Sequence, residues 1–249
     1  MQEKSALDRA MAMVRDLRAR CAWDRVQTRE TLRPYLIEEV HELDRAIGTG
    51  AVPAIQSEVA DLLLHLAWQL VLAEESGEFT AAEVAGLLEA KMKRRHPHLF
   101  DLGDREGWET LKQRERSSGG DPGGVLDGLP PTLPDLLMAF RLQERAAGVG
   151  FDWPDAGGPA GKVREELEEV EAETDPARRE EEIGDLLFAV VNLARKLQVN
   201  PGAALERANA RFVRRFRSME RIAEQRGIEV HRAGLETLDG LWDEAKRAG

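Results

Sequence analysis

Apolar side chains along most of the chain recur every three or four residues, which is the spacing of one face of an α-helix. Runs in which apolar and polar residues alternate, as they do in a half-buried strand, are absent, and the chain has a single Tyr. The pattern therefore predicts an all-α protein. Helices are expected at residues 5–19, 30–47, 54–75, 80–95, 134–147, 159–173, 177–198, 202–226 and 235–247.

A stretch rich in Gly and Pro interrupts the helical pattern near the middle of the chain. Residues 117–134 have the sequence SSGGDPGGVLDGLPPTLP, and these two residue types disfavour a continuous helix. The stretch predicts a linker at 117–134 between an N-terminal helical domain at 1–116 and a C-terminal helical domain at 135–249. Two domains of ordinary size are consistent with a chain of 249 residues.

Similar segments recur in the same order in the two halves. The pairs are EEVHE (38–42) and EELEE (165–169), EVADLLL (58–64) and EIGDLLF (182–188), KMKRR (91–95) and RFVRR (211–215), and WETLK (108–112) and WDEAK (242–246). Each pair alone is weak evidence, but four pairs in one order predict the duplication of a four-helix unit.

Each half also carries two pairs of carboxylates spaced three residues apart, so that both members of a pair lie on one helix face. A Glu-rich helix by itself is more often a solvated surface, but the recurrence of the pairs in both halves favours a metal site. Two such helices side by side would bring four hard oxygen ligands together, which suits Mg²⁺, with Mn²⁺ as an alternative. The pairs are Glu166 with Glu169, Glu182 with Asp185, Glu39 with Glu42, and Glu58 with Asp61.

An apolar run follows the last carboxylate of each set. Asp185 precedes LLFAVVNLA (186–194), and Asp61 precedes LLLHLAW (62–68). A helix that is apolar almost all round is expected to be buried. An unpaired carboxylate at the start of a buried helix is costly, so we expect a divalent cation to neutralise these sets.

Basic and aromatic residues recur near the acidic pairs at helical spacing. Arg binds phosphate oxygens through paired hydrogen bonds, and an indole ring can stack on a nucleobase. Each such residue alone is more often an ordinary surface or core residue, but beside a metal cluster they favour a nucleoside phosphate as the ligand. The pairs that share a helix face are Arg211 with Arg215, Lys91 with Arg95, and Trp242 with Lys246.

The composition of the chain limits the kinds of partner and the cellular compartment that it fits. The formal net charge of −11 argues against nucleic acid as the main partner. Cys21 is the single cysteine, which excludes an internal disulfide and fits a reducing compartment. The longest apolar run, 62–73, is short and broken by polar residues, and the N-terminus lacks the apolar core of a signal peptide. We expect a cytoplasmic protein without a membrane span.

Taken together, these segments resemble the MazG family of nucleoside triphosphate pyrophosphohydrolases, in the all-α NTP pyrophosphatase superfamily. The resemblance implies Mg²⁺-dependent hydrolysis of NTPs or dNTPs between the α- and β-phosphates, for nucleotide-pool housekeeping. It also implies a homodimer in which four-helix units pair to complete each site. The segments that carry it are CAWDRVQTRETLRPYLIEEVHEL (21–43), EVADLLLHL (58–66), KRRHPHLF (93–100), VGFDW (149–153), EEIGDLLFAVVNLARKL (181–197), ANARFVRRF (208–216) and LETLDGLW (235–242).

The same resemblance assigns roles to individual residues, chiefly in the second half. Glu166, Glu169, Glu182 and Asp185 would bind the metal. As a separate hypothesis on the mechanism, Glu165 or Glu166 takes the proton from water. The nucleotide would be bound by Lys162, Val163, Arg164, Glu165, Glu166, Arg178, Arg211, Arg215 and Trp242, to which the shared helix face adds Lys246. A second site in the first half would comprise Glu39, Glu42, Glu58, Asp61, Lys91 and Arg95.

Two alternatives remain open at this stage. A sister enzyme of the same fold would act on dUTP or phosphoribosyl-ATP. A non-catalytic helical module would bind a nucleotide or a partner protein without turnover. The full set of acidic residues in both halves favours an enzyme.

Overall fold

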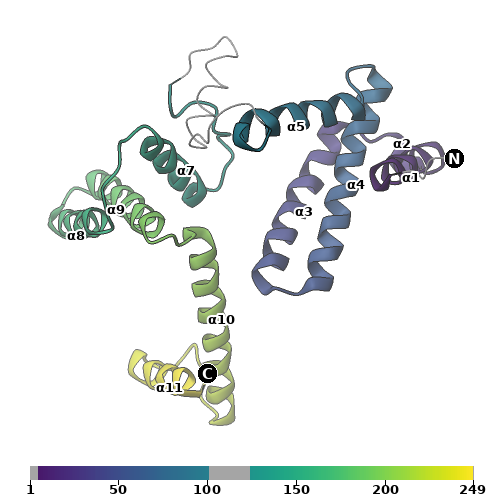
Figure 1. Ribbon diagram of the computed structural model, residues 1–249. Helices are drawn as coiled ribbons and strands as arrows, with labels where there is room; N and C mark the ends of the chain where they lie inside the picture. Colours follow the sequence, from purple (N-terminus) through teal and green to yellow (C-terminus); the bar gives the residue numbers. More distant parts are fainter. Residues whose placement is uncertain (1–4, 101–123, 249) are drawn as a thin grey trace. The chain divides into compact units, whose positions relative to one another are not determined.

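Every regular element is helical in the part of the chain that the computed structural model describes, residues 5–100 and 124–248 (Figure 1). The expected all-α class is therefore confirmed for these residues. Each of the nine expected helices is present, with ends within two residues of the expected ones. The segment WETLK (108–112) and the first part of the expected linker, 117–123, lie outside the described residues.

The chain divides into two compact units, residues 1–105 and 106–249. The domain bounds expected from the sequence stay a prediction. The elements of the first unit are α1 (Ala6–Arg20), α2 (Ala22–Arg25), α3 (Arg29–Thr49), α4 (Val52–Ser76), α5 (Ala81–Arg95) and the short 3₁₀ helix η1 (Pro97–Leu99). Those of the second are α7 (Asp135–Gly148), α8 (Gly157–Ala172), α9 (Pro176–Lys196), α10 (Pro201–Gln225) and α11 (Leu235–Ala248).

Local signals define the helix pair α3–α4 in the first unit. The Thr28 hydroxyl accepts a hydrogen bond from the backbone N–H of Thr31 and so begins α3. Gly50 ends α3 and Gly77 ends α4, both in the left-handed conformation that favours glycine. Because only two residues, Gly50 and Ala51, connect α3 to α4, the two helices run side by side in opposite directions (Figure 1).

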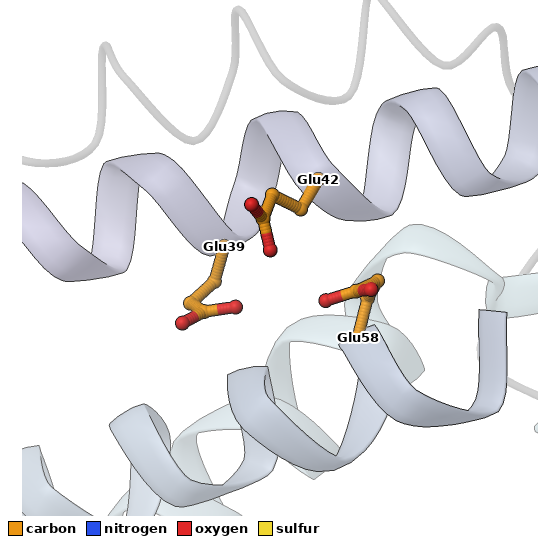
Figure 2. A group of neighbouring side chains, drawn as sticks. All are labelled: Glu39, Glu42 and Glu58. Atoms are coloured by element: carbon orange, nitrogen blue, oxygen red, sulfur yellow. The ribbon is translucent and has the colours of Figure 1, made fainter. Parts of the chain in front are cut away.

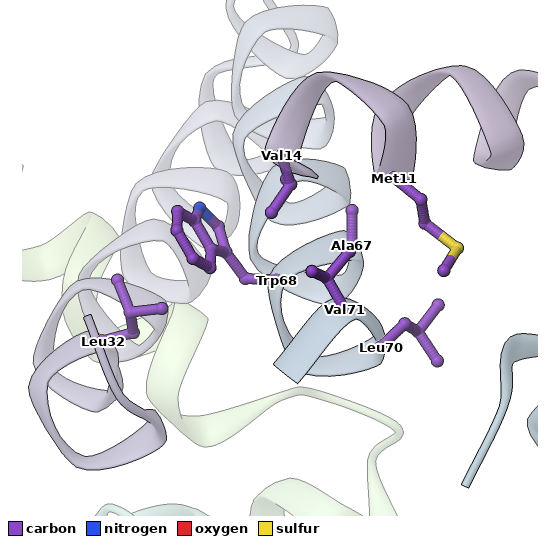
Figure 3. Packing of buried hydrophobic residues seen from close by; sticks show 7 residues of the cluster. All are labelled: Met11, Val14, Leu32, Ala67, Trp68, Leu70 and Val71. Carbon is purple, nitrogen blue, oxygen red and sulfur yellow. The ribbon is translucent and has the colours of Figure 1, made fainter. Parts of the chain in front are cut away.

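The core of the first unit lies where α1 and α3 pack against the C-terminal half of α4 (Figure 3). Trp68 of α4 is 2% exposed, and the guanidinium of Arg18 lies 5.4 Å from the centre of its ring. The other members of this buried cluster are Met11, Val14, Leu32, Ala67, Leu70 and Val71.

In the second unit, α9 is the central helix, because α8, α7 and α10 all pack against it. Asp175 begins α9 by accepting hydrogen bonds from the backbone N–H groups of Ala177 and Arg178, at 3.0 and 3.1 Å. Pro176 at the first helical position is compatible with this start. A separate apolar cluster joins α10 to α11 through Met219, Ala223, Leu241 and Ala245.

The expectation that the apolar run after Asp185 is buried almost all round was wrong for the single chain. Leu187, Phe188 and Val190 are exposed, with 55% of Leu187 accessible, and Asp185 is exposed as well. The reason is that the neighbouring helices cover one side of α9, and in this run they bury Ala189, Val191 and Asn192. Among the described helices, none is both long and apolar enough to cross a membrane.

Candidate functional site

Three carboxylates of the second unit converge where α8 lies against α9. Glu166 and Glu169 project from α8 and Glu182 projects from α9, and one oxygen atom of each lies within 4.8 Å of the others. The spacing of three residues puts the first two on one helix face, and the short connection to α9 brings the third opposite them. The group has the ligand type and the separations that a divalent cation requires.

The negative charges of this cluster lie close together, and one of the three carboxylates is buried. Glu166 is 3% exposed, and its Oε2 atom is buried without a hydrogen-bond partner among the described residues. Burial raises the pKa of the Glu169 carboxyl, and the neighbouring charges of Glu166 and Glu182 raise it further. The folded protein therefore resists full ionisation of the cluster unless positive charge is supplied.

Lys162 supplies part of that charge from the preceding turn of α8. Its ammonium group forms an ion pair with Glu166 and another with Glu165, the latter at 2.9 Å. Hydrogen bonds to Glu166 and then to Glu165 raise the pKa of Lys162 above its usual value. One cation shared by two carboxylates still leaves the three-carboxylate cluster with net negative charge.

A cavity of about 530 Å³ opens beside the cluster. Lys162, Glu166 and Asp185 form one part of its wall, so these predicted site residues are brought together. The rest of the wall is largely apolar and lies between α7, α8 and α9. It includes the aromatic rings of Phe151, Trp153 and Phe188 and the side-chain amides of Gln143 and Asn192.

The sequence analysis missed the aromatic and amide part of this wall. Asn192 is the one polar residue of the run at 186–194. Gln143 is a polar residue of α7 in the same unit, and it is 6% exposed. A buried amide in an apolar run was the available signal, because buried polar groups need a partner.

The Trp153 segment is held against the end of α9 by ion pairs. Asp152 accepts hydrogen bonds from both Nη atoms of Arg195 and from Nζ of Lys196, which lies 3.1 Å away. Lys196 also donates to the backbone oxygen of Trp153 at 2.6 Å. The Arg195 hydrogen bonds are the main cause of a lowered pKa at Asp152.

The remaining predicted residues of the second half lie apart from the cavity wall within one chain. Val163 and Arg164 are on α8, where Arg164 is exposed and donates to the Ala160 carbonyl at 3.1 Å. Trp242 packs on Phe212 with ring centres 5.3 Å apart, and Lys246 pairs with Asp243 at 3.2 Å. The described side chains that contribute nothing to the cavity wall include Arg178, Arg211, Arg215, Trp242 and Lys246.

The first unit repeats the acidic cluster between α3 and α4. Glu39 and Glu42 of α3 face Glu58 of α4, and one oxygen of each lies within 4.8 Å of the others (Figure 2). Burial and then the charge of Asp61 raise the pKa of Glu39. Lys91 and Arg95 lie on α5, outside this helix pair.

The two units differ in the positions that line the cavity. When 58–71 is matched to 182–195 without a gap, His65, Trp68 and Val71 stand where the second unit has Ala189, Asn192 and Arg195. All three are buried in α4. At the positions that line the cavity in the second unit, the first unit thus has buried side chains.

Comparison with known proteins decides the family. A family model described as the MazG nucleotide pyrophosphohydrolase domain matches residues 27–100. The chain is 43% identical over 231 residues to the nucleoside triphosphate pyrophosphohydrolase/pyrophosphatase MazG of Thermotoga maritima, covering 91% of this chain and 89% of that protein. This chain belongs to the MazG family.

Other relatives support this MazG assignment. The nucleoside triphosphate pyrophosphohydrolase of Escherichia coli K12 is 39% identical over 249 residues, covering 95% of this chain and 94% of that protein. The uncharacterized protein YabN of Bacillus subtilis is 39% identical over 248 residues, but the match covers 50% of its length. The MazG family model covers the first acidic cluster, and the whole-chain matches extend over the second.

Proposed function

We propose that this chain is a Mg²⁺-dependent hydrolase that cleaves NTPs or dNTPs between the α- and β-phosphates, releasing pyrophosphate and the nucleoside monophosphate. The observation that carries the proposal is the convergence of Glu166, Glu169 and Glu182 beside a cavity of about 530 Å³. That volume is within the range of small-ligand sites. The relatives named as nucleoside triphosphate pyrophosphohydrolases support the reaction. A cytoplasmic role in nucleotide-pool housekeeping is part of the proposal.

The acidic cluster suits a metal ion better than a network of hydrogen bonds. Glu166 Oε2 is buried without a donor among the described residues, and an acceptor in that state is costly. Hard carboxylate oxygens favour Mg²⁺, or Mn²⁺ in its place. Glu166, Glu169 and Glu182 would hold the ion, with Asp185 on the cavity side. Bound there, the ion would neutralise phosphate charge and polarise the phosphorus that water attacks.

The side chains around the cluster would carry the remaining steps. One oxygen of Glu166 is already engaged by Lys162 and the other is the buried candidate ligand. Glu165 also pairs with Lys162 through one oxygen, but it is exposed, so it is the better placed of the two to take a proton from the attacking water. Lys162 would bind a phosphate oxygen from the cavity wall.

We also propose that the site is completed by a second copy of the chain. Ile183, Leu187 and Val190 form an exposed apolar stripe along α9, because their spacing puts them on one face. Covering that stripe with another copy would bury it, and the helices of that copy could carry the predicted nucleotide-binding cations. Those side chains are Arg178, Arg211, Arg215 and Lys246, together with the indole of Trp242. In this arrangement the two units are duplicated four-helix folds that pair across the dimer.

The first unit would hold a second metal cluster at Glu39, Glu42, Glu58 and Asp61, with Lys91 and Arg95 of α5 as the cations predicted for that half. The acidic part of that site is supported by the approach of three carboxylate oxygens. The buried side chains of His65, Trp68 and Val71 disfavour an equivalent nucleoside cavity there.

The test is pyrophosphate release from a panel of NTPs and dNTPs with Mg²⁺, for the wild type, Asp61→Asn and Asp185→Asn. We expect release from several nucleotides, and a fall in kcat of about a hundredfold or more in Asp185→Asn. Asp61→Asn is the matched substitution in the first unit and should retain most of the activity. Equal losses in both variants would make both units catalytic.

The panel also separates the alternatives. Turnover confined to dUTP, or to phosphoribosyl-ATP when this is added, would identify a sister enzyme of the same fold. Nucleotide binding without pyrophosphate release from any substrate would overturn the enzymatic proposal in favour of a binding module.

A further inference from the structure

The orientation of the Gln143 amide is determined by its partner. Its Nε2 atom donates a hydrogen bond of 2.8 Å to the carbonyl oxygen of Phe188 on α9. A carbonyl only accepts, so the nitrogen must face it and Oε1 must point the other way. Gln143 Oε1 is buried without a donor among the described residues, and the side chain forms part of the cavity wall. A buried acceptor without a donor is costly, and this one belongs to a side chain that borders the cavity.

Asn192 has the opposite orientation for an equally definite reason. Its Oδ1 atom accepts hydrogen bonds from Nε and Nη2 of Arg195, at 3.0 and 2.8 Å. A guanidinium only donates, so Oδ1 must face it and the Nδ2 donors must point away. The pairing of Arg195 with Asp152 keeps the guanidinium in place. Asn192 is 8% exposed and forms part of the same cavity wall.

The Gln143 amide of α7 contacts α9 at Phe188, one turn from Asn192. Phe188 and Asn192 are four residues apart in α9, so they lie on one face in successive turns. Gln143 is hydrogen-bonded to the backbone carbonyl of Phe188, and Asn192 lies one turn further along α9. Both side chains line the cavity with the rings of Phe151, Trp153 and Phe188, and their amides have opposite orientations toward their protein partners.

We propose that Gln143 and Asn192 recognise the edge of the nucleobase, with Gln143 Oε1 accepting from a base N–H and Asn192 Nδ2 donating to the adjacent base acceptor. This inference rests on the proposed function, because it assumes a nucleotide whose phosphates lie at the Glu166 end of the cavity. Adenine, guanine, cytosine and uracil each present one donor beside one acceptor, so the pair admits all four. Flat aromatic side chains bind any base by stacking.

The substitution Asn192→Asp tests this assignment with little change in shape. The carboxylate keeps an oxygen facing Arg195 and replaces the Nδ2 donor by a second acceptor. Two adjacent acceptors match only the N1–H and N2 amino group of guanine. We expect the ratio of kcat/KM for GTP to that for UTP to rise about tenfold or more, because the wrong bases leave a buried acceptor unpaired. Any general effect of the added charge cancels in this ratio.

A second variant tests Gln143 separately. N3-methyl-UTP lacks the N–H that Gln143 would bind, so the wild type should prefer UTP over it by about tenfold. Gln143→Met removes the acceptor at similar length and should bring that preference close to one. Circular dichroism confirms the fold of each variant.

The outcomes are distinct from those that bear on the proposed reaction. Unchanged base ratios in both variants, with all nucleotides affected equally, would overturn the inference and leave the amides with a structural role. If the wild type releases no pyrophosphate, calorimetric binding of GMP and UMP to the wild type and Asn192→Asp gives the same ratio without turnover. A GMP preference in Asn192→Asp would then support base recognition although the proposed hydrolysis had failed.

Discussion

Gly158 lies directly under the indole ring of Trp153. A Cβ atom at position 158 would lie 2.6 Å from Nε1 of that ring and closer still to Cδ1, which no packed side chain tolerates. The backbone that carries the ring is also held in place. Asp152 accepts a hydrogen bond from Arg195 of α9, and the Trp153 backbone oxygen accepts one from Lys196. The first turn of α8 and the last turn of α9 thus determine where this aromatic part of the cavity wall stands.

Gly158→Ala should displace Trp153 and weaken nucleotide binding. We expect KM to rise by about threefold to tenfold for all nucleotides, with a smaller change in kcat, because the ring stacks on the base rather than on the phosphates. Gly161→Ala is the matched control, since Gly161 is one turn further along α8 with open space around its Cα. Steady-state kinetics of the two variants measure the difference. An unchanged KM in Gly158→Ala would exclude Trp153 from base binding.

Lys162→Met should destabilise the metal-free protein. The substitution leaves the buried Glu166 without its cation, and an uncompensated buried charge is unfavourable. We expect Tm to fall by a few degrees, and by less when Mg²⁺ is present, because the ion replaces the lost charge. Arg164→Met removes the same charge from an exposed residue of the same helix and should change Tm little. Thermal denaturation with and without EDTA gives both comparisons.

Stabilisation by Mg²⁺ should depend on pH. The pKa of Glu169 and that of Glu39 are raised in the fold by burial and by neighbouring carboxylates, so their ionised forms cost stability above the raised pKa. That cost disappears as the pH falls through the raised pKa, and the protons that then bind compete with the metal. We expect the rise in Tm with Mg²⁺ to be larger at neutral pH than in mild acid. NaCl at equal ionic strength is the control, and a pH-independent rise would contradict ion binding at these clusters.

Mixed dimers should recover activity if Arg215 acts across a dimer interface. Asp185→Asn and Arg215→Ala should each be inactive alone. In a dimer of one chain of each kind, one of the two sites would combine an intact Asp185 with an intact Arg215 from the other chain. Random pairing then restores about one quarter of wild-type activity, because half of the dimers are mixed and half of their sites are intact. Co-expression without selection gives this mixture, and mixed dimers isolated through two affinity tags should reach about one half of wild-type activity. No recovery in either sample would place both residues of a site in one chain.

The sequence by itself determined the features that depend on near neighbours. Thr28, Gly50 and Asp175 set helix ends through hydrogen bonds and backbone angles within a few residues, so the helices could be located closely. The spacing of Glu166 and Glu169 likewise placed both on one face, and the structure brings Glu182 to the same point. Helical geometry makes both kinds of inference local.

Only the tertiary structure decided which surfaces are covered and which groups meet across the unit. The bond from Gln143 to the Phe188 carbonyl joins residues 45 positions apart, and no local spacing predicts it. The exposure of Leu187 and the packing of Trp153 against Gly158 depend on the positions of the neighbouring helices. A side chain's burial depends on all of the elements around it, and these are assembled by long-range packing rather than by the helix that carries it.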